Sequence, residues 1–255
     1  MSTNVVIGPW RHKWIWLGLV LSVLILAAQP AKAQFYVRSP DVDKGELKLE
    51  EHGAVYTGPG EAERRRQSHE LEVKYGFTDR LEGIFESTYR QNIGDDLKPH
   101  RIEVGAQYEF VERHGDGLGL AFRTLYEFAL HSGDPDEILF GPIAKYVWGS
   151  DSLTMNAFFI GQVGDHVDID SLEFKFNWRA KHEFNKTWAI GVEGYSEIGD
   201  LSHAGTFEEQ KHRLGPVAYL ELEGAPEWEF AAGALFGVSD ATSDVTFKFD
   251  AEIAF

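Results

Sequence analysis

Leu172-Glu173-Phe174-Lys175-Phe176-Asn177-Trp178-Arg179-Ala180-Lys181 alternates apolar and polar side chains without a break. Successive side chains of a β-strand point to opposite faces, so this stretch predicts a strand with one apolar and one polar face. A helix with the same sequence would scatter its apolar side chains around the whole surface. Because the period of two recurs along the chain, it decides the fold class.

The same alternation predicts twelve strands, each about long enough to cross a bilayer at a tilt. They are expected near residues 45–56, 68–77, 81–91, 100–110, 118–131, 137–148, 152–163, 171–184, 187–198, 210–223, 227–238 and 244–255. Odd strands are followed by longer polar loops and most even strands by tight turns, an asymmetry typical of outer-membrane barrels. The predicted fold is therefore an all-β, antiparallel, up-and-down transmembrane barrel.

The first 33 residues have the pattern of an export signal. Arg11 and Lys13 precede an apolar run over residues 14–28, and Ala31-Lys32-Ala33 fits a small-residue cleavage site. The run is shorter than the roughly 20 residues that a spanning helix needs, although an uncleaved anchor is the alternative. We expect a signal peptide over residues 1–33 and a barrel domain over residues 34–255.

Alternation alone does not distinguish a soluble barrel from a membrane barrel with its apolar face outward. Aromatic side chains gather beside the predicted tight turns, at Tyr75, Phe77, Tyr108, Trp148 and Trp188 among others. Such a ring is typical of the interfacial girdle of a membrane barrel. The opposite face is rich in charge, which suits a watery lumen, so the apolar face is predicted to contact lipid.

Two similar stretches carry a proline inside a predicted strand, at Pro142 and Pro216. Proline has no backbone N–H to donate to a neighbouring strand, and within sheets it is confined to edges or bulges. A closed barrel has no edge, so a β-bulge is expected at each site.

The last strand ends in Phe247-Lys248-Phe249-Asp250-Ala251-Glu252-Ile253-Ala254-Phe255. It resembles the terminal strand of proteobacterial outer-membrane barrels, whose final aromatic residue is read by the barrel-assembly machinery. The phrase from Tyr75 to Glu82 also resembles a turn in transporter barrels of the meta-cleavage phenol-degradation pathway. These resemblances imply the outer membrane as location, lipid and lipopolysaccharide as surroundings, and a transporter-like role.

Charge and composition exclude several classes of function. The chain carries 24 Lys and Arg against 41 Asp and Glu, and it has no cysteine. A net charge of −17 argues against nucleic acid as a partner, because such binding needs a basic face. The absence of cysteine excludes disulfides, thiol catalysis and cysteine-ligated zinc. No cofactor is expected, because no dinucleotide, phosphate-loop or metalloprotease motif occurs.

Three functions fit these patterns. The first is a channel or porin-like transporter for small cationic or polar solutes, since carboxylates in a pore stabilise cations. The second is a closed structural or adhesive barrel whose lumen is plugged by paired charges. The third is a lipid-modifying enzyme, which needs an outward-facing Ser–His pair. No such pair is evident, so catalysis is not expected. Ten side chains are predicted to line the lumen: Glu82, Glu86, Arg90, Arg101, Glu103, Glu127, Glu173, Lys175, Arg179 and Glu193.

Histidines concentrate in the half of the barrel that carries the longer loops. His100, His131 and His212 fall there, near loop carboxylates. Imidazole and carboxylate together suit divalent transition metals, but no pair shows metal-ligand spacing in the sequence. A metal-binding mouth is therefore a hypothesis, and ordinary loop polarity is its alternative.

Overall fold

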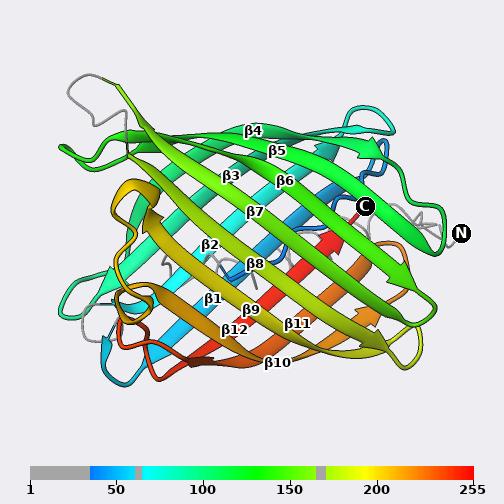
Figure 1. The fold of residues 1–255 in the computed structure, drawn as a ribbon. Coiled ribbons are helices and arrows are strands. Elements are labelled where there is room, and N and C mark those ends of the chain that lie inside the picture. Colours follow the sequence, from blue (N-terminus) through cyan, green and yellow to red (C-terminus); the bar gives the residue numbers. More distant parts are fainter. Residues whose placement is uncertain (1–34, 61–64, 165–170) are drawn as a thin grey trace, which may run out of the picture.

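A computed structural model describes residues 35–60, 65–164 and 171–255; the predicted signal peptide lies outside these residues. They form a closed antiparallel barrel of twelve strands, in which each strand pairs with its neighbours in the chain and β1 closes the ring with β12 (Figure 1). The strands are β1 (Leu47–Thr57), β2 (Arg65–Gly76), β3 (Leu81–Asn92), β4 (Lys98–Val111), β5 (Gly117–Ala129), β6 (Asp136–Trp148), β7 (Asp151–Val163), β8 (Leu172–Glu183), β9 (Trp188–Asp200), β10 (Lys211–Leu222), β11 (Glu227–Gly237) and β12 (Val245–Ala254).

All twelve predicted strands are confirmed, and their bounds differ from the prediction by at most three residues. Closure pairs Lys48 with Ala254 and Thr57 with Val245, so the sheet has no free edge. The backbone groups of every strand are thereby bonded within the ring, as hydrocarbon surroundings require. None of the described residues forms a helix that is long and apolar enough to span a bilayer.

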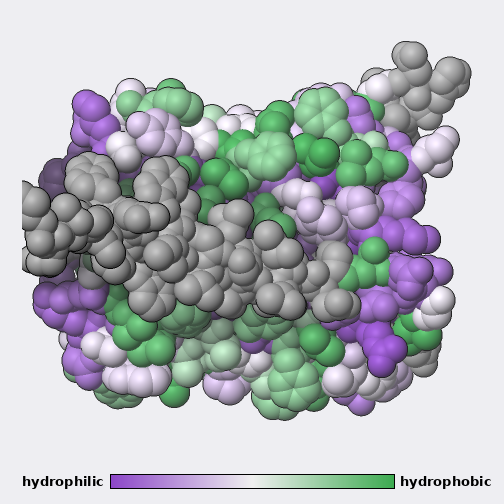
Figure 2. Space-filling model, turned by 180° about the vertical axis from the view of Figure 1, so that it is seen from behind, coloured by the Kyte–Doolittle hydropathy of each residue, from purple (hydrophilic) through white to green (hydrophobic). Residues whose placement is uncertain are grey.

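The barrel is apolar outside and polar inside. In β12, Phe247 and Phe249 are exposed while Lys248 is buried between them, and most of the other strands alternate in the same way. At the end with the short turns, exposed aromatic rings such as Phe77, Phe110 and Trp188 form the predicted girdle. Figure 2 shows apolar side chains over the wall and hydrophilic ones toward both ends. This distribution matches a lipid-facing exterior.

The two ends of the barrel differ as predicted. Longer connections follow β1, β3, β5, β7, β9 and β11 at one end, here called the loop end, and two short 3₁₀ helices, η2 (Leu201–His203) and η3 (Phe207–Glu209), lie in one of them. Short turns join the strands at the opposite, turn end. The chain finishes at the turn end, where the Phe255 N–H donates to the Leu47 carbonyl over 3.0 Å.

The predicted bulges at the two prolines are wrong. The register of β6 with β7 is the same on both sides of Pro142, and the register of β10 with β11 is the same on both sides of Pro216. Pairing is interrupted locally, but no residue is inserted. Glycine precedes each proline, and a Cβ there would collide with a carbonyl of the neighbouring strand. Close approach of two strands at a glycine therefore accommodates each proline without a bulge.

Candidate functional site

A segment that the sequence did not reveal occupies the lumen. Residues 35–42, here called the lumen segment, precede β1 and have no regular secondary structure. The Arg38 N–H donates to Oδ1 of Asn156 on β7 over 2.8 Å, and Asn156 Nδ2 donates to the Arg38 carbonyl over 2.9 Å. Val37 is fully buried. The segment thus lies inside the barrel and is held by its backbone to one wall.

The side chain of Arg38 reaches the opposite wall. Its guanidinium contacts four buried carboxylates on β1, β2 and β3, which we call the acidic wall: Glu50, Glu70, Glu72 and Glu86. From β5, Arg123 also binds Glu72 and Glu86 of this wall. Because its backbone bonds β7 and its side chain bonds β1–β3, Arg38 spans the lumen. Buried charges need such partners, since an unpaired one is costly.

Aromatic contacts hold the part of the lumen segment nearer the loop end. The Phe35 ring lies edge-on to Tyr56 and Tyr195, with centroids 5.9 and 5.3 Å away, and the Arg213 guanidinium lies 4.4 Å from its centroid. Tyr36 stacks on His52 at 3.9 Å between ring centroids. These contacts add β9 and β10 to the strands that Arg38 contacts.

Toward the turn end, Asp41 fixes the lumen segment. Its carboxylate accepts from Lys145 Nζ over 2.5 Å and lies 3.5 Å from the Arg113 guanidinium. Gln107 Nε2 donates to the Ser39 carbonyl over 3.0 Å. The segment is therefore held by ionic contacts at two of its residues, the cation Arg38 and the anion Asp41.

A second buried network joins β9, β10 and β12 on the inside of the barrel. Glu193 of β9 accepts from Tyr195 Oη over 2.5 Å, from Tyr219 Oη over 2.7 Å and from Lys248 Nζ over 2.6 Å. Lys248 also lies 2.8 Å from Asp250, which His52 links to Glu50 of the acidic wall. Hydrogen bonds and ion pairs thus run from wall to wall.

Two vestibules remain on either side of the lumen segment. The outer vestibule, at the loop end, has a volume of about 350 Å³ and mixes both charges: Arg65, Arg90, Arg101, Lys175 and Lys211 with Asp134, Glu137, Glu173 and Glu197. The inner vestibule, at the turn end, has a volume of about 400 Å³ and is acidic, with eight carboxylates and only Lys48 and Lys186 as cations. Beside Arg38, between the two, lies a cavity of about 40 Å³.

The ten predicted lumen residues all project to the inside of the wall. Seven are buried within it: Glu82, Glu86, Arg101, Glu103, Glu127, Arg179 and Glu193. Arg90, Glu173 and Lys175 are partly exposed and line the outer vestibule, as does Arg101, which donates to Glu137 over 2.6 Å. Their role in conduction stays a prediction. Sequence reasoning missed Arg38, Asn156 and Lys248, although Lys248 lies on the polar face of an alternating strand.

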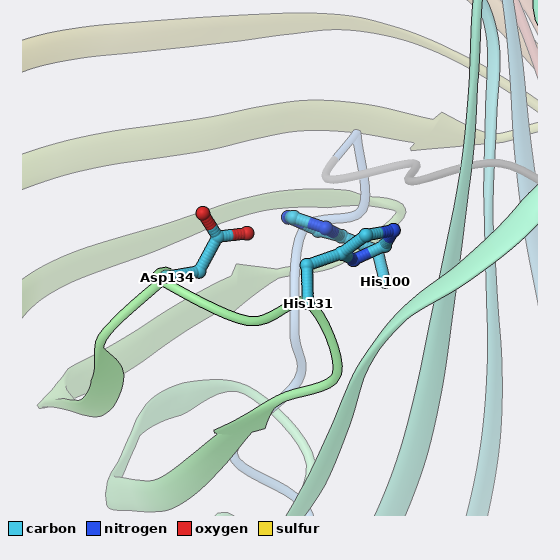
Figure 3. A group of neighbouring side chains, drawn as sticks. All are labelled: His100, His131 and Asp134. Atoms are coloured by element: carbon cyan, nitrogen blue, oxygen red, sulfur yellow. The ribbon is translucent and has the colours of Figure 1, made fainter.

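The rim histidines separate into two environments. His100 and His131 lie together with Asp134, and the ligand atoms of the three side chains are within 4.8 Å of one another (Figure 3). His212 does not join them: it bonds Ser196 over 3.0 Å and Gln210 over 2.9 Å, and it stacks on Phe207. The three rim histidines therefore do not share one environment: His100 and His131 lie beside Asp134, and His212 lies apart from them. Metal binding at the mouth stays a hypothesis.

No model of a known protein family matches the chain, and no protein of curated function matches it either. The resemblance to phenol-pathway transporters is thus not confirmed. Solved outer-membrane proteins are similar in structure to this chain. The NanC porin is 12% identical, with 81% of this chain and 98% of that chain covered at a TM-score of 0.52. Omp33 of Acinetobacter baumannii is 9% identical, with 83% and 99% covered at 0.49.

OprD of Pseudomonas aeruginosa is 11% identical, with 84% of this chain covered and a TM-score of 0.42; this chain spans 65% of its length. At 12% identity, the likeness to NanC shows the fold alone. The closed twelve-stranded ring, its apolar exterior and its charged interior are those of a barrel that resides in the outer membrane. The chain is an outer-membrane β-barrel with the architecture of porins.

Proposed function

We propose that the protein is a porin-like channel for small polar or cationic solutes, and that the lumen segment closes it. The observation that carries this proposal is the pair of vestibules, about 350 and 400 Å³, separated by a segment that is not part of the wall. A wall side chain cannot leave a bore. A segment that precedes the first strand can withdraw, given the cleavage predicted after residue 33. Displacing residues 35–42 would join the two vestibules along the barrel axis.

The charges of the inner vestibule support a cation preference. Eight carboxylates surround it, from Asp43 before β1 to Glu252 of β12. Rings of carboxylates stabilise cations and repel anions in a pore. The outer vestibule carries charges of both signs, so we expect it to admit polar solutes of either charge. We expect the acidic inner vestibule to set the preference for cations.

Conductance in a planar bilayer tests the proposal. We expect the protein purified from outer membranes to show rare openings, and a variant lacking residues 35–42 to show frequent ones. Under a salt gradient the reversal potential should indicate cation selectivity. Arg80→Ala, at an exposed turn residue, is the matched control. A deletion variant that folds but stays silent would refute the channel.

A closed structural barrel is the second candidate, because ionic networks cross the lumen from wall to wall. It predicts that neither the complete protein nor the deletion variant conducts ions. The two candidates therefore differ in the same recording.

A lipid-modifying enzyme has less support. Glu51 lies on the same face of β1 as the exposed Val55, and His69 lies on the same face of β2 as the exposed Val73. The Nδ1 atom of His69 lies 2.5 Å from the Glu51 carboxylate. A hydrolase of this kind also needs a serine hydroxyl at the other imidazole nitrogen. Among the described residues, His69 Nε2 has no hydrogen-bond partner. Turnover of phospholipid by the purified protein would overturn this view.

A further inference from the structure

We propose that His100, His131 and Asp134 form a binding site for a divalent transition-metal ion at the outer mouth of the barrel. His100 lies near the start of β4, and the other two lie in the loop of residues 130–135 between β5 and β6. Figure 3 shows the two imidazole rings beside each other with the Asp134 carboxylate next to them. The ring centroids are 5.7 Å apart.

The backbone brings these residues together. The Leu130 N–H donates to the His100 carbonyl over 3.1 Å, which ties the loop to β4 beside His131. The Asp134 N–H donates to the His131 carbonyl over 3.2 Å, closing a turn that returns the carboxylate toward the imidazole. Gly133 occupies this turn with φ of +100°, a conformation that other residues rarely adopt. The arrangement is thus set by the turn as well as by the side chains.

The donor set selects the class of metal. Two imidazoles and one carboxylate suit Zn²⁺, Ni²⁺ or Cu²⁺, whereas Ca²⁺ and Mg²⁺ prefer oxygen ligands throughout. Ligand atoms about 2.1 Å from a tetrahedral metal lie about 3.4 Å from one another. The three ligand atoms are already within 4.8 Å, and His131 and Asp134 are exposed, so small side-chain rotations complete the geometry.

The surroundings leave room for the remaining ligands. The three residues line a pocket of about 380 Å³ to which Asp95 and Asp96 also contribute. These aspartates provide either a fourth ligand or acceptors for a metal-bound water. The pocket also contains Arg90 and Lys98, whose charges the three aspartates offset.

Two other groups of carboxylates and histidine in the described residues have ligand atoms as close together, but they are buried inside the barrel beside cations. Glu50, His52 and Glu72 form one group, and Glu70, Glu72 and Glu86 form the other. Arg38, Arg123 and Lys74 neutralise them. The rim site is the one that opens directly to the outer vestibule, through His100 and Asp134.

The test is calorimetric titration of Zn²⁺ into the complete, detergent-purified protein. We expect one ion per barrel, and at least about a 100-fold loss of affinity in His100→Ala/His131→Ala, because even the loss of groups that only orient metal ligands costs 10–100-fold. Asp134→Asn should weaken binding less. His212→Ala and His203→Ala, histidines of the same barrel end outside the trio, should bind as the unmodified protein does.

The site would be overturned by the absence of stoichiometric Zn²⁺ binding to the folded protein, or by an affinity of the double variant equal to that of the unmodified protein. Ca²⁺ that competes with Zn²⁺ at equal concentration would also overturn it, because it would indicate carboxylates alone. Electron paramagnetic resonance of bound Cu²⁺ should show coupling to two nitrogens. Heat-dependent gel mobility confirms that each variant is folded. The site does not rest on the proposed channel, and a silent barrel that binds Zn²⁺ would refute only the channel.

Discussion

Replacing Arg38 by alanine should release the lumen segment. The guanidinium is shared by four carboxylates of the acidic wall, and losing one partner of a buried ion pair costs about 3–5 kcal/mol. Arg123 and Lys74 remain to neutralise the wall, so the lower value applies. At about 1.4 kcal/mol per tenfold change, a loss of about 3 kcal/mol shifts the balance between bound and withdrawn segment roughly 100-fold.

Single-channel recording measures this shift as open probability. We expect Arg38→Ala to open about 100-fold more often than the unmodified protein, with Arg80→Ala unchanged. The contacts of Asn156 and Phe35 remain, so the segment should rebind and the openings should be transient. A folded Arg38→Ala barrel with unchanged open probability would refute the assignment of Arg38 as the main attachment.

A chemical probe gives an independent reading. The chain contains no cysteine, so Val37→Cys introduces a unique thiol, and Val37 is fully buried. A membrane-impermeant maleimide should label this thiol slowly, and much faster when Arg38→Ala is added. Equal labelling rates in the two backgrounds would mean that the segment stays in place without Arg38.

Three further substitutions test the barrel itself. Lys248→Met leaves Glu193 without its cation and should lower the free energy of unfolding by about 3–5 kcal/mol, seen as an earlier urea midpoint. Gly141→Ala forces a Cβ against the Ala157 carbonyl and should cost about 1–3 kcal/mol in the same assay; an unchanged midpoint would contradict the close approach of β6 and β7. Phe255→Ala should reduce the yield of heat-modifiable barrel in outer membranes while refolding in detergent is retained; equal yield would exclude Phe255 as the assembly signal.

The strands could be predicted from the sequence because each carries its own signal. The alternation from Leu172 to Lys181 is local, and one face of it must meet lipid, so the face to which each side chain points follows from it. The register between neighbouring strands does not follow from it and comes from the structure. The prolines show where this reasoning stops. Whether Pro142 needs a bulge depends on how closely β7 approaches β6. Gly141 permits a close approach because it has no Cβ, and this contact is visible only in the structure.

The lumen segment could not be predicted because its partners are remote in sequence. Arg38 bonds Asn156, 118 residues away, and residues 35–42 show neither strand nor helix periodicity. The grouping of residues at the proposed metal site could not be predicted from the sequence for a similar reason. His100 reaches His131 and Asp134 only through the pairing of β4 with β5 and the turn at Gly133.

Closure and cation preference involve the same side chains. The four carboxylates of the acidic wall face three cations, Arg38, Arg123 and Lys74, which leaves one negative charge in excess. When Arg38 withdraws, the excess becomes two negative charges. A passing cation would then occupy the place of the guanidinium, whereas an anion would meet unpaired carboxylates. In the proposed channel, the lumen segment is therefore a substitute for the solute, and its withdrawal creates the field that selects cations.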